Sequence, residues 1–302
     1  MNGIHFTTKT KIALTVAVLL WASAFVGIRA GLEGYSPGAL ASLRFIVAAL
    51  CMGLIHFRLP KRPSVTWPDR IWLLLIGGFG LGIYNVTLNI GEIQVASGIA
   101  SFIISQSPVV TLILAILFLD EKLRLQMVIG MMISIIGVGL IAWGETKNFA
   151  LNTGVFYILI ATLIGGIYSV VQKPFLKKYH AIEVTAWIIW GAALFLLMWF
   201  PEVITQLKTA PIAATAWVVY LGIFPAALGY IAWSYGLKDI PASSAANVLY
   251  FLPVIATILG WVVLSEVPAK LSLLGGFVAL LGVWIVNRRG RPSMRNPRAQ
   301  NR

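Results

Sequence analysis

The chain has 302 residues, of which 59% are hydrophobic and only 11% are charged, and its net charge is +13. Soluble domains carry about 25% charged residues, so the composition excludes a water-soluble globular enzyme and predicts an integral membrane protein. The single cysteine, Cys51, excludes an intramolecular disulfide and a thiolate metal cluster.

Ten predominantly apolar runs follow one another along the chain, and each is close to the roughly 20 residues that a helix needs to cross a bilayer. These ten spans cover approximately 12–31, 37–57, 71–90, 95–118, 125–143, 153–173, 182–200, 215–236, 242–264 and 271–287. We therefore predict an all-α polytopic membrane protein with no room for a soluble domain.

The lysines and arginines set the expected orientation. With the N-terminus in the cytoplasm, 18 of the 23 fall in cytoplasmic segments, including six arginines after Asn287. The positive-inside rule then places both termini in the cytoplasm, the protein in the cell (cytoplasmic or inner) membrane, and residues 291–302 in a basic cytoplasmic tail. The positive charge therefore predicts contact with the lipid bilayer and no nucleic-acid partner.

The two halves of the chain match without a gap at an offset of 145 residues. Residues 72–141 and 217–286 share 14 identities in 70 positions. The informative pairs include Trp72/Trp217, Gly77/Gly222, Pro108/Pro253, Glu121/Glu266, Gly130/Gly275 and Gly137/Gly282. Because five spans per repeat is an odd number, the second copy enters the membrane from the opposite face. We predict two five-helix inverted-topology repeats, 1–145 and 146–290, as in secondary transporters with a midplane site; the alternative is a scaffold that merely retains a duplication.

Pro108 and Pro253 lie in the middle of equivalent spans. Each lacks an N–H, so the carbonyls of Ile104 and Leu249 lose their usual helical partners. Such carbonyls should face protein or a water-filled cavity. The two prolines are therefore either ordinary packed kinks or hinges beside a cavity.

Neutral polar and aromatic side chains are the candidate substrate-binding groups. Several recur four residues apart, which places them on one helix face. The candidates are Tyr84, Asn85, Ser101, Ser105, Tyr168, Tyr230, Asn247, Tyr250 and Phe251. They suit a small polar or zwitterionic solute, whereas helix–helix hydrogen bonding is the alternative role for any single serine.

Charged residues inside the spans are few. Arg44 sits seven residues into its span, about 10 Å deep, and either holds a substrate carboxylate, gates the outer vestibule or braces its helix against carbonyls or Glu33. Arg29 is expected to extend to the interface. All ten acids fall in loops or at span ends, so we expect no proton-carrying carboxylate at the central site, and Glu121 and Glu266 should cap or pin helix ends.

Short motifs resemble the EamA branch of the drug/metabolite transporter superfamily across residues 10–288. They are Trp21-Ala-Ser-Ala-Phe25 followed by Arg29, then Leu43-Arg44-Phe45, and the proline-to-glutamate blocks that begin at Ser107 and Leu252. The resemblance implies a bacterial or archaeal exporter of amino acids or related metabolites, with aromatic amino acids as one option. It also adds Trp21 to the candidate substrate-binding residues.

The sequence thus predicts a secondary exporter of small solutes that acts as a monomer or weak homodimer, with spans 5 and 10 as the contact surface. We expect no catalytic residue, metal or cofactor. The alternatives are a carrier of nucleotide-sugar-like or drug-like solutes and, from another class, a membrane-embedded enzyme or a structural protein.

Overall fold

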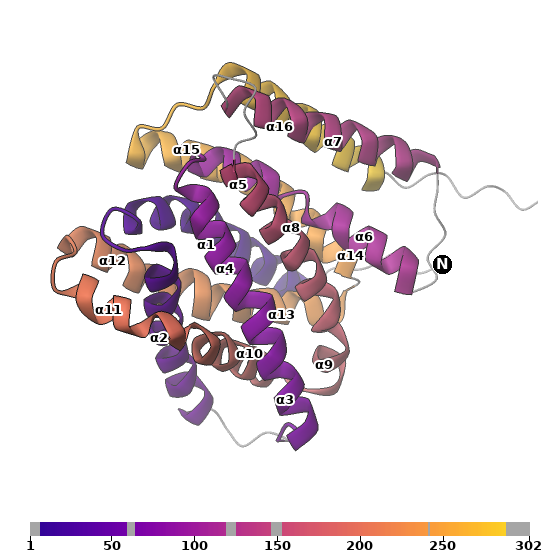
Figure 1. Cartoon of the computed structure of the whole chain (residues 1–302). Coiled ribbons are helices and arrows are strands. Elements are labelled where there is room, and N and C mark those ends of the chain that lie inside the picture. Colours follow the sequence, from indigo (N-terminus) through magenta and orange to yellow (C-terminus); the bar gives the residue numbers. More distant parts are fainter. Residues whose placement is uncertain (1–6, 59–63, 119–124, 146–152, 241, 288–302) are drawn as a thin grey trace, which may run out of the picture.

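The computed structural model describes residues 7–58, 64–118, 125–145, 153–240 and 242–287, and all regular structure in these ranges is helical (Figure 1). The helices are α1 (Thr8–Gly31), α2 (Pro37–Arg58), α3 (Trp67–Leu75), η1 (Ile76–Gly82), α4 (Ile83–Glu92), α5 (Ser97–Ile104), α6 (Ser107–Phe118), α7 (Leu125–Glu145), α8 (Thr153–Val171), α9 (Lys173–Lys178), α10 (Ala181–Leu196), η2 (Leu197–Trp199), α11 (Phe200–Leu207), α12 (Ile212–Leu221), η3 (Gly222–Gly229), α13 (Tyr230–Asp239), α14 (Ala242–Ala246), η4 (Asn247–Phe251), α15 (Leu252–Leu264) and α16 (Lys270–Asn287).

Consecutive helices join into the ten predicted spans. Six of these are long and apolar enough to cross a membrane by length and composition: Thr8–Gly31, Pro37–Arg58, Trp67–Glu92, Thr153–Lys178, Ala181–Leu207 and Ile212–Asp239. The other four are α5–α6, α7, α14–η4–α15 and α16, of which two are interrupted at the prolines. The all-α polytopic prediction is confirmed, while the basic tail 291–302 and Glu121 lie outside the described residues.

Polar contacts between loops and helix ends define the two ends of the bundle. At one end, the Ser36 hydroxyl donates to Glu202 at 2.5 Å. We call it the Glu92 end, because α4 ends there at Glu92. At the other, which we call the Asp69 end, the Lys178 ammonium pairs with Asp69 at 2.5 Å. Successive spans run alternately between these two ends.

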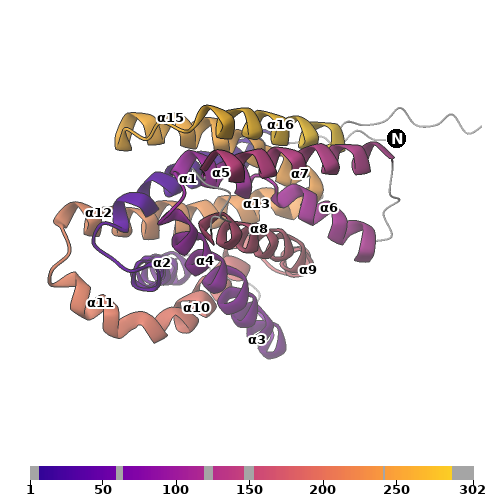
Figure 2. The same cartoon turned by 45° about the horizontal axis from the view of Figure 1, so that its top comes forward.

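Helices α7 and α16 are the fifth spans of the two repeats, and they lie side by side along the edge of the molecule (Figures 1 and 2). A Cβ added at Gly282 would lie 2.5 Å from the carbonyl oxygen of Gly130. A Cβ added at Gly275 would lie 2.7 Å from that of Gly137. Since the lower-numbered glycine of one helix meets the higher-numbered glycine of the other, the two helices are antiparallel.

The contact centres on a pair of equivalent residues. The Ser134 hydroxyl lies 3.3 Å from the carbonyl oxygen of Ala279, exactly the repeat offset of 145 residues away in the chain. An axis of approximate twofold symmetry therefore passes between them, and equivalent helices run in opposite directions. The inverted repeat is thus built into the packing, and the glycines of spans 5 and 10 bring the two helices together within one chain.

The second and third spans cross over between the repeats. Gly222 of η3 packs on α2, where an added Cβ would lie 2.7 Å from the Arg44 carbonyl oxygen. Its equivalent, Gly77 of η1, packs on α10, where an added Cβ would lie 2.8 Å from the carbonyl carbon of Ile188. The packing therefore shows which residues of the second spans are equivalent, which the sequence comparison does not. Arg44 of the first repeat corresponds to the buried Ile188 of the second.

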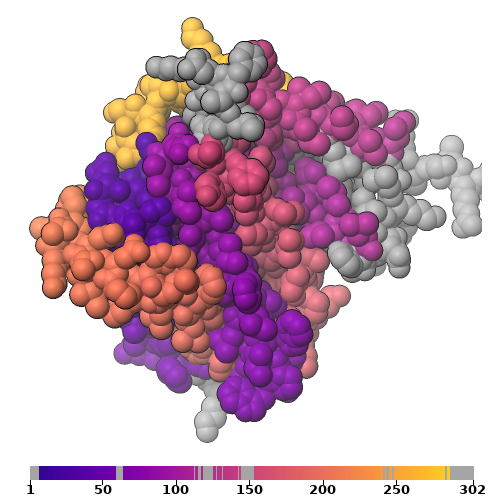
Figure 3. Space-filling model, viewed as in Figure 1, coloured from indigo at the N-terminus to yellow at the C-terminus, as the bar shows by residue number. Residues whose placement is uncertain are grey.

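The outer surface of the bundle is apolar. Large hydrophobic side chains such as Trp72, Phe156 and Leu194 are exposed, as expected for helices that face lipid. In Figure 3 an orange segment that includes α11 lies beside the indigo and purple helices of the first repeat on the face shown. Polar groups are correspondingly concentrated inside, where the candidate site lies.

Candidate functional site

A cavity of about 70 Å³ lies where the two repeats meet. It is lined by Trp21, Ala24, Phe25, Ile28, Arg44, Gly80, Leu81, Tyr84, Leu88, Ile104, Ser107, Gly165, Tyr168, Ser169, Tyr230, Trp233, Leu249 and Leu252. Ligand sites usually measure roughly 300–1,000 Å³, so this volume holds a few waters but must widen to admit an amino acid. Both repeats contribute to its wall, as the inverted repeat predicts.

Irregular helix geometry in both repeats borders the cavity. The third spans each contain a π-helical segment, η1 and η3, at equivalent positions, and such segments are frequent at functional sites. Residues Gly80 and Leu81 of η1 reach the cavity directly. The same local distortion therefore occurs twice, once on each side of the approximate twofold axis.

The fourth spans are interrupted immediately before their prolines. The carbonyl oxygen of Ile104 accepts a hydrogen bond from the Ser107 hydroxyl at 2.6 Å, and that of Leu249 accepts one from the backbone N–H of Leu252. The carbonyls that lose their usual partners thus gain others. Ile104, Ser107, Leu249 and Leu252 all line the cavity, so Pro108 and Pro253 mark its edge. That the two prolines act as hinges stays a prediction.

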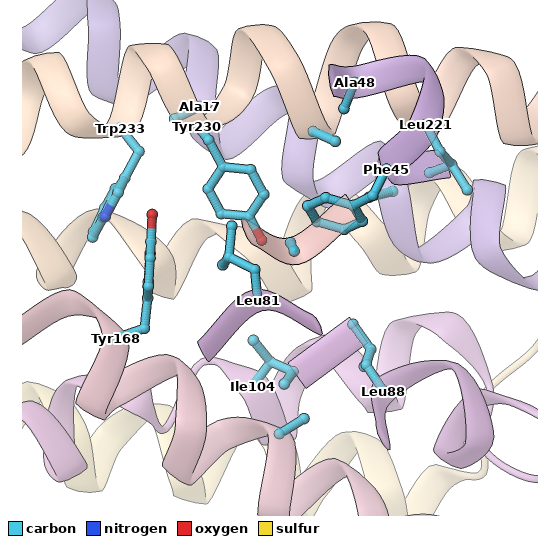
Figure 4. Packing of buried hydrophobic residues seen from close by; sticks show 14 of the residues in the cluster. Ala17, Phe45, Ala48, Leu81, Leu88, Ile104, Tyr168, Leu221, Tyr230 and Trp233 are labelled. Carbon is cyan, nitrogen blue, oxygen red and sulfur yellow. The ribbon is translucent and has the colours of Figure 1, made fainter. Parts of the chain in front are cut away.

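Aromatic rings from α1, α8 and α13 form one wall of the cavity. The Trp21 ring lies 5.2 Å from the rings of both Tyr230 and Trp233, and Tyr168 lies 6.0 Å from Tyr230. In Figure 4 the Tyr168 hydroxyl points between the side chains of Trp233 and Tyr230. That hydroxyl and the Trp233 indole N–H have no hydrogen-bond partner among the described residues, so two polar groups in this wall are free for a solute.

Arg44 brings a positive charge to the cavity. Its side chain is only 3% exposed, and its Nε and Nη1 atoms have no hydrogen-bond partner among the described residues. The guanidinium lies 5.8 Å from the centre of the adjacent Phe45 ring. A buried charged donor without an acceptor is costly. Arg44 therefore offers two unpaired hydrogen-bond donors to an anionic ligand. Neither of these nitrogens bonds to a carbonyl oxygen of the described residues, so they do not support the alternative in which Arg44 only fixes its helix.

The structure brings together five of the predicted binding residues: Trp21, Arg44, Tyr84, Tyr168 and Tyr230. The candidate serines instead bond within their own helix, Ser101 to the Gly98 carbonyl at 2.5 Å and Ser105 to the Phe102 carbonyl at 2.7 Å. Neither serine lines the cavity, and neither bond joins two helices, so the binding role of both stays a prediction.

Three of the remaining candidates, Asn85, Tyr250 and Phe251, also lie outside the cavity wall. Asn85 is buried and donates to the Leu81 carbonyl at 2.8 Å. Phe251 is 64% exposed and so points away from the interior. Tyr250 is half-buried on η4 without lining the cavity, and the side chain of Asn247 lies outside the described set. Binding roles for these four stay predictions.

The Glu92 end is closed by a charged bridge between α1, α5 and the segment after α15. Arg29 Nε donates to Glu266 at 2.8 Å, and Arg29 Nη1 donates to the backbone carbonyls of Glu92 and Ile93 at 2.5 and 3.1 Å. Glu266 also accepts from the Ser97 N–H and hydroxyl at 2.9 and 2.7 Å. Glu266 thus caps α5 as predicted. Arg29 also joins the ends of neighbouring helices, a role that the sequence did not predict.

A tight turn aims Glu266 at this bridge. Ser265 adopts the left-handed conformation with φ of 56°, and the Glu266 N–H bonds back to the Gly260 carbonyl at 3.1 Å. This is the pattern in which a left-handed residue ends a helix, at a cost of roughly 1–2 kcal/mol for a residue with a side chain. The turn reverses the chain so that the Glu266 carboxylate reaches α5.

The Asp69 end carries a matching clamp. The Lys173 ammonium donates to the backbone carbonyls of Leu237, Lys238 and Ile240, the last two at 3.0 and 2.5 Å. Leu237 and Lys238 lie 145 residues after the two carbonyls that Arg29 holds. A cation at the end of the first span of each repeat therefore holds the end of that repeat's third span, at opposite ends of the bundle.

Glu92 lies at a span end, as predicted, but it is buried. It is the last residue of α4, yet it is fully buried and neither of its carboxylate oxygens has a hydrogen-bond partner among the described residues. It lies one helical turn beyond Leu88, which lines the cavity. The cavity lining itself contains no carboxylate in the part of the chain that the structure describes.

Sequence reasoning missed the apolar part of the lining, chiefly Phe25, Ile28, Leu81 and Leu88. These residue types are abundant in every span, so nothing distinguishes them before the helices are packed. The one available signal was the cluster of glycines around Gly80, where the π-helical segment forms.

Comparison with known proteins gives consistent matches over nearly the whole chain. The profile of the EamA-like transporter family matches residues 8–143 and 152–288. A "Probable terminal-alkyne amino-acid exporter" from Streptantibioticus cattleyicolor is 35% identical over 285 residues, covering 93% of this chain and 94% of that protein. The "Uncharacterized transporter YdfC" of Bacillus subtilis is 36% identical over 281 residues, covering 92% and 90%. A solved crystal structure with 19% identity shares the fold, with a TM-score of 0.65 over 93% of this chain and 99% of the other.

Proposed function

Because the chain belongs to the EamA-like transporter family, we propose that it is a secondary transporter that exports amino acids or related small metabolites by alternating access. The cavity around Arg44 is the substrate site in this proposal. The observation that carries it is the buried guanidinium of Arg44, with two unpartnered nitrogens, beside a wall of aromatic rings. The relative named as a probable amino-acid exporter supports the same class of solute.

The cavity chemistry matches the two ends of an amino acid. A carboxylate is the natural partner of the Arg44 guanidinium, because charge-assisted hydrogen bonds are the strongest available. The rings of Trp21, Tyr168 and Tyr230 offer an apolar surface to a side chain and π faces to an ammonium group. Aromatic amino acids fit this wall particularly well. A nucleotide-sugar-like solute would require more positive charge than Arg44 supplies in the described lining.

The two clamps support alternating access. Arg29 at the Glu92 end and Lys173 at the Asp69 end occupy corresponding places related by the approximate symmetry. Releasing one while keeping the other would open the cavity to one side only. The distribution of lysine and arginine favours a cytoplasmic location for both termini. In that orientation the Asp69 end faces the cytoplasm and the Glu92 end faces the outside.

The test is counterflow in liposomes that contain the purified chain, with a panel of amino acids and one nucleotide sugar. We expect counterflow with amino acids and a rise of roughly 10–100-fold in the half-saturating concentration for Arg44→Gln, since a hydrogen bond to a charged group contributes about 1.5–3 kcal/mol. Arg58→Gln is the matched control, because Arg58 lies on the same helix but is exposed.

Three results would contradict the proposal. Transport by Arg44→Gln that equals wild type would remove Arg44 from the substrate site. Counterflow with the nucleotide sugar alone would favour the larger-solute alternative, and the absence of any transport would refute the exporter itself.

A further inference from the structure

Glu92 is a buried carboxyl group that the transport proposal does not use. Its side chain has an exposed fraction of 0%, and Oε1 and Oε2 both lack a hydrogen-bond partner among the described residues. Its backbone is fixed, because Arg29 Nη1 holds the Glu92 carbonyl at 2.5 Å. A permanently ionised carboxylate in such a place is expensive, so the group requires either a counter-charge or a proton.

The charged groups that face Glu92 come from three directions. Arg29 on α1, Arg44 on α2 and Glu266 after α15 act on it electrostatically. The other elements packed against α4 are η1, α5 and α8, whose sequences contain no acidic or basic residue. The phenols of Tyr84 and Tyr230 lie near Arg44. The balance at Glu92 is therefore set by two arginines and one glutamate.

One of these arginines is already neutralised. Arg29 is paired with Glu266 at 2.8 Å, and Glu266 is further fixed by Ser97. Arg44 has no such acid, since two of its nitrogens are unpartnered. This leaves one buried cation, Arg44, and one buried carboxyl, Glu92, as the charges that must balance each other across the wall of the cavity.

A substrate carboxylate disturbs that balance. In the empty cavity the positive charge of Arg44 favours the ionised form of Glu92, whereas burial opposes it. When a solute carboxylate bonds to Arg44, an ionised Glu92 would leave one excess negative charge in a poorly solvated region, at a cost of several kcal/mol. A proton on Glu92 removes that excess charge.

We propose that Glu92 is a proton-binding site linked to the solute through Arg44, so that the protein takes up a proton at Glu92 when a carboxylate enters the cavity. The proposal rests on the proposed function. It places the proton behind the cavity wall, whereas sequence reasoning considered a carboxylate only at the central site.

The first test counts protons on binding. Calorimetric titration of the purified chain with L-phenylalanine, in two buffers with different heats of ionisation, should show uptake of up to one proton per bound ligand, and affinity should rise by up to about tenfold per unit fall in pH. Glu92→Gln should still bind but lose the uptake. Glu33→Gln is the matched control, because Glu33 is an exposed acid in the neighbouring α1–α2 loop. Binding without proton uptake, or uptake that survives in Glu92→Gln, would overturn the proposal.

The second test needs no solute, so its failure is separate from failure of the proposed function. Infrared spectra at neutral pH should show the carbonyl stretch of a protonated carboxyl group in Arg44→Gln, because Glu92 has lost its counter-charge. The band should be absent from the double variant Arg44→Gln/Glu92→Gln. If Arg44→Gln lacks the band, Glu92 stays ionised without Arg44 and the charge-balance reasoning is wrong.

Discussion

The contact between α7 and α16 makes a quantitative prediction about Gly137. A Cβ added there would lie 2.6 Å from the Ala279 Cα atom, whereas ordinary contacts begin at 3.4 Å. The atom in the way belongs to backbone, so no side chain can turn aside. The two helices would have to separate by almost 1 Å.

Gly137→Ala should therefore destabilise the protein although alanine favours helix. Overpacking of this kind costs roughly 1–3 kcal/mol, and the gain in helix propensity is about 1 kcal/mol. Gly139→Ala is the matched control, since the same helix carries this glycine with no atom within 4 Å of an added Cβ. Because both variants gain the same propensity, the difference between them isolates the helix contact.

Thermal unfolding of the purified variants in detergent measures that difference. We expect Gly137→Ala to unfold several degrees below wild type and Gly139→Ala to unfold at or above it. Equal midpoints for the two variants would show that α7 and α16 do not pack through these glycines, and the symmetry argument built on that contact would lose its basis.

The remaining predictions concern the bridge at the Glu92 end and the cavity wall. Glu266→Gln removes the partner of Arg29 and weakens the cap on α5, so it should lower the thermal midpoint through loss of roughly 1.5–3 kcal/mol; a midpoint equal to wild type would mean that the bridge adds nothing to stability. Tyr168→Phe removes a hydroxyl that has no protein partner in the described structure, so stability should hold while the half-saturating concentration in counterflow rises roughly 2–10-fold. The exposed Tyr235→Phe serves as its control, and equal effects of the two would place the Tyr168 hydroxyl outside the solute site.

The architecture was predictable because it depends on patterns that are visible in the sequence before the helices pack. Span number comes from apolar run length, and inversion follows from an odd number of spans per repeat. The shared pairs Gly130/Gly275 and Gly137/Gly282 occupy the helix contact itself. Conserved spacing of small residues within one chain is therefore a direct signal of its symmetry-related contacts.

The site was only partly predictable, because helix faces are fixed by tertiary packing. The serines at 101 and 105 share a face, but the nearest backbone carbonyls satisfy them before any solute could. Glu92 shows the converse. The sequence places it at the end of a span, but its burial comes from the packing of α1, α2 and α8 around α4. Burial of a polar group is a property of its neighbours, which a single sequence does not supply.

The central claim is that one cavity opens alternately to the two faces of the membrane, and the labelling of one cavity cysteine tests it directly. Ser169 lines the cavity, so Ser169→Cys in a Cys51→Ser background gives a single reporter. Its reaction with a membrane-impermeant maleimide is measured from each side of oriented vesicles. We predict that Arg29→Met accelerates labelling only from the face that carries Glu92 and that Lys173→Met accelerates it only from the opposite face. Acceleration from the same face in both variants would contradict the account.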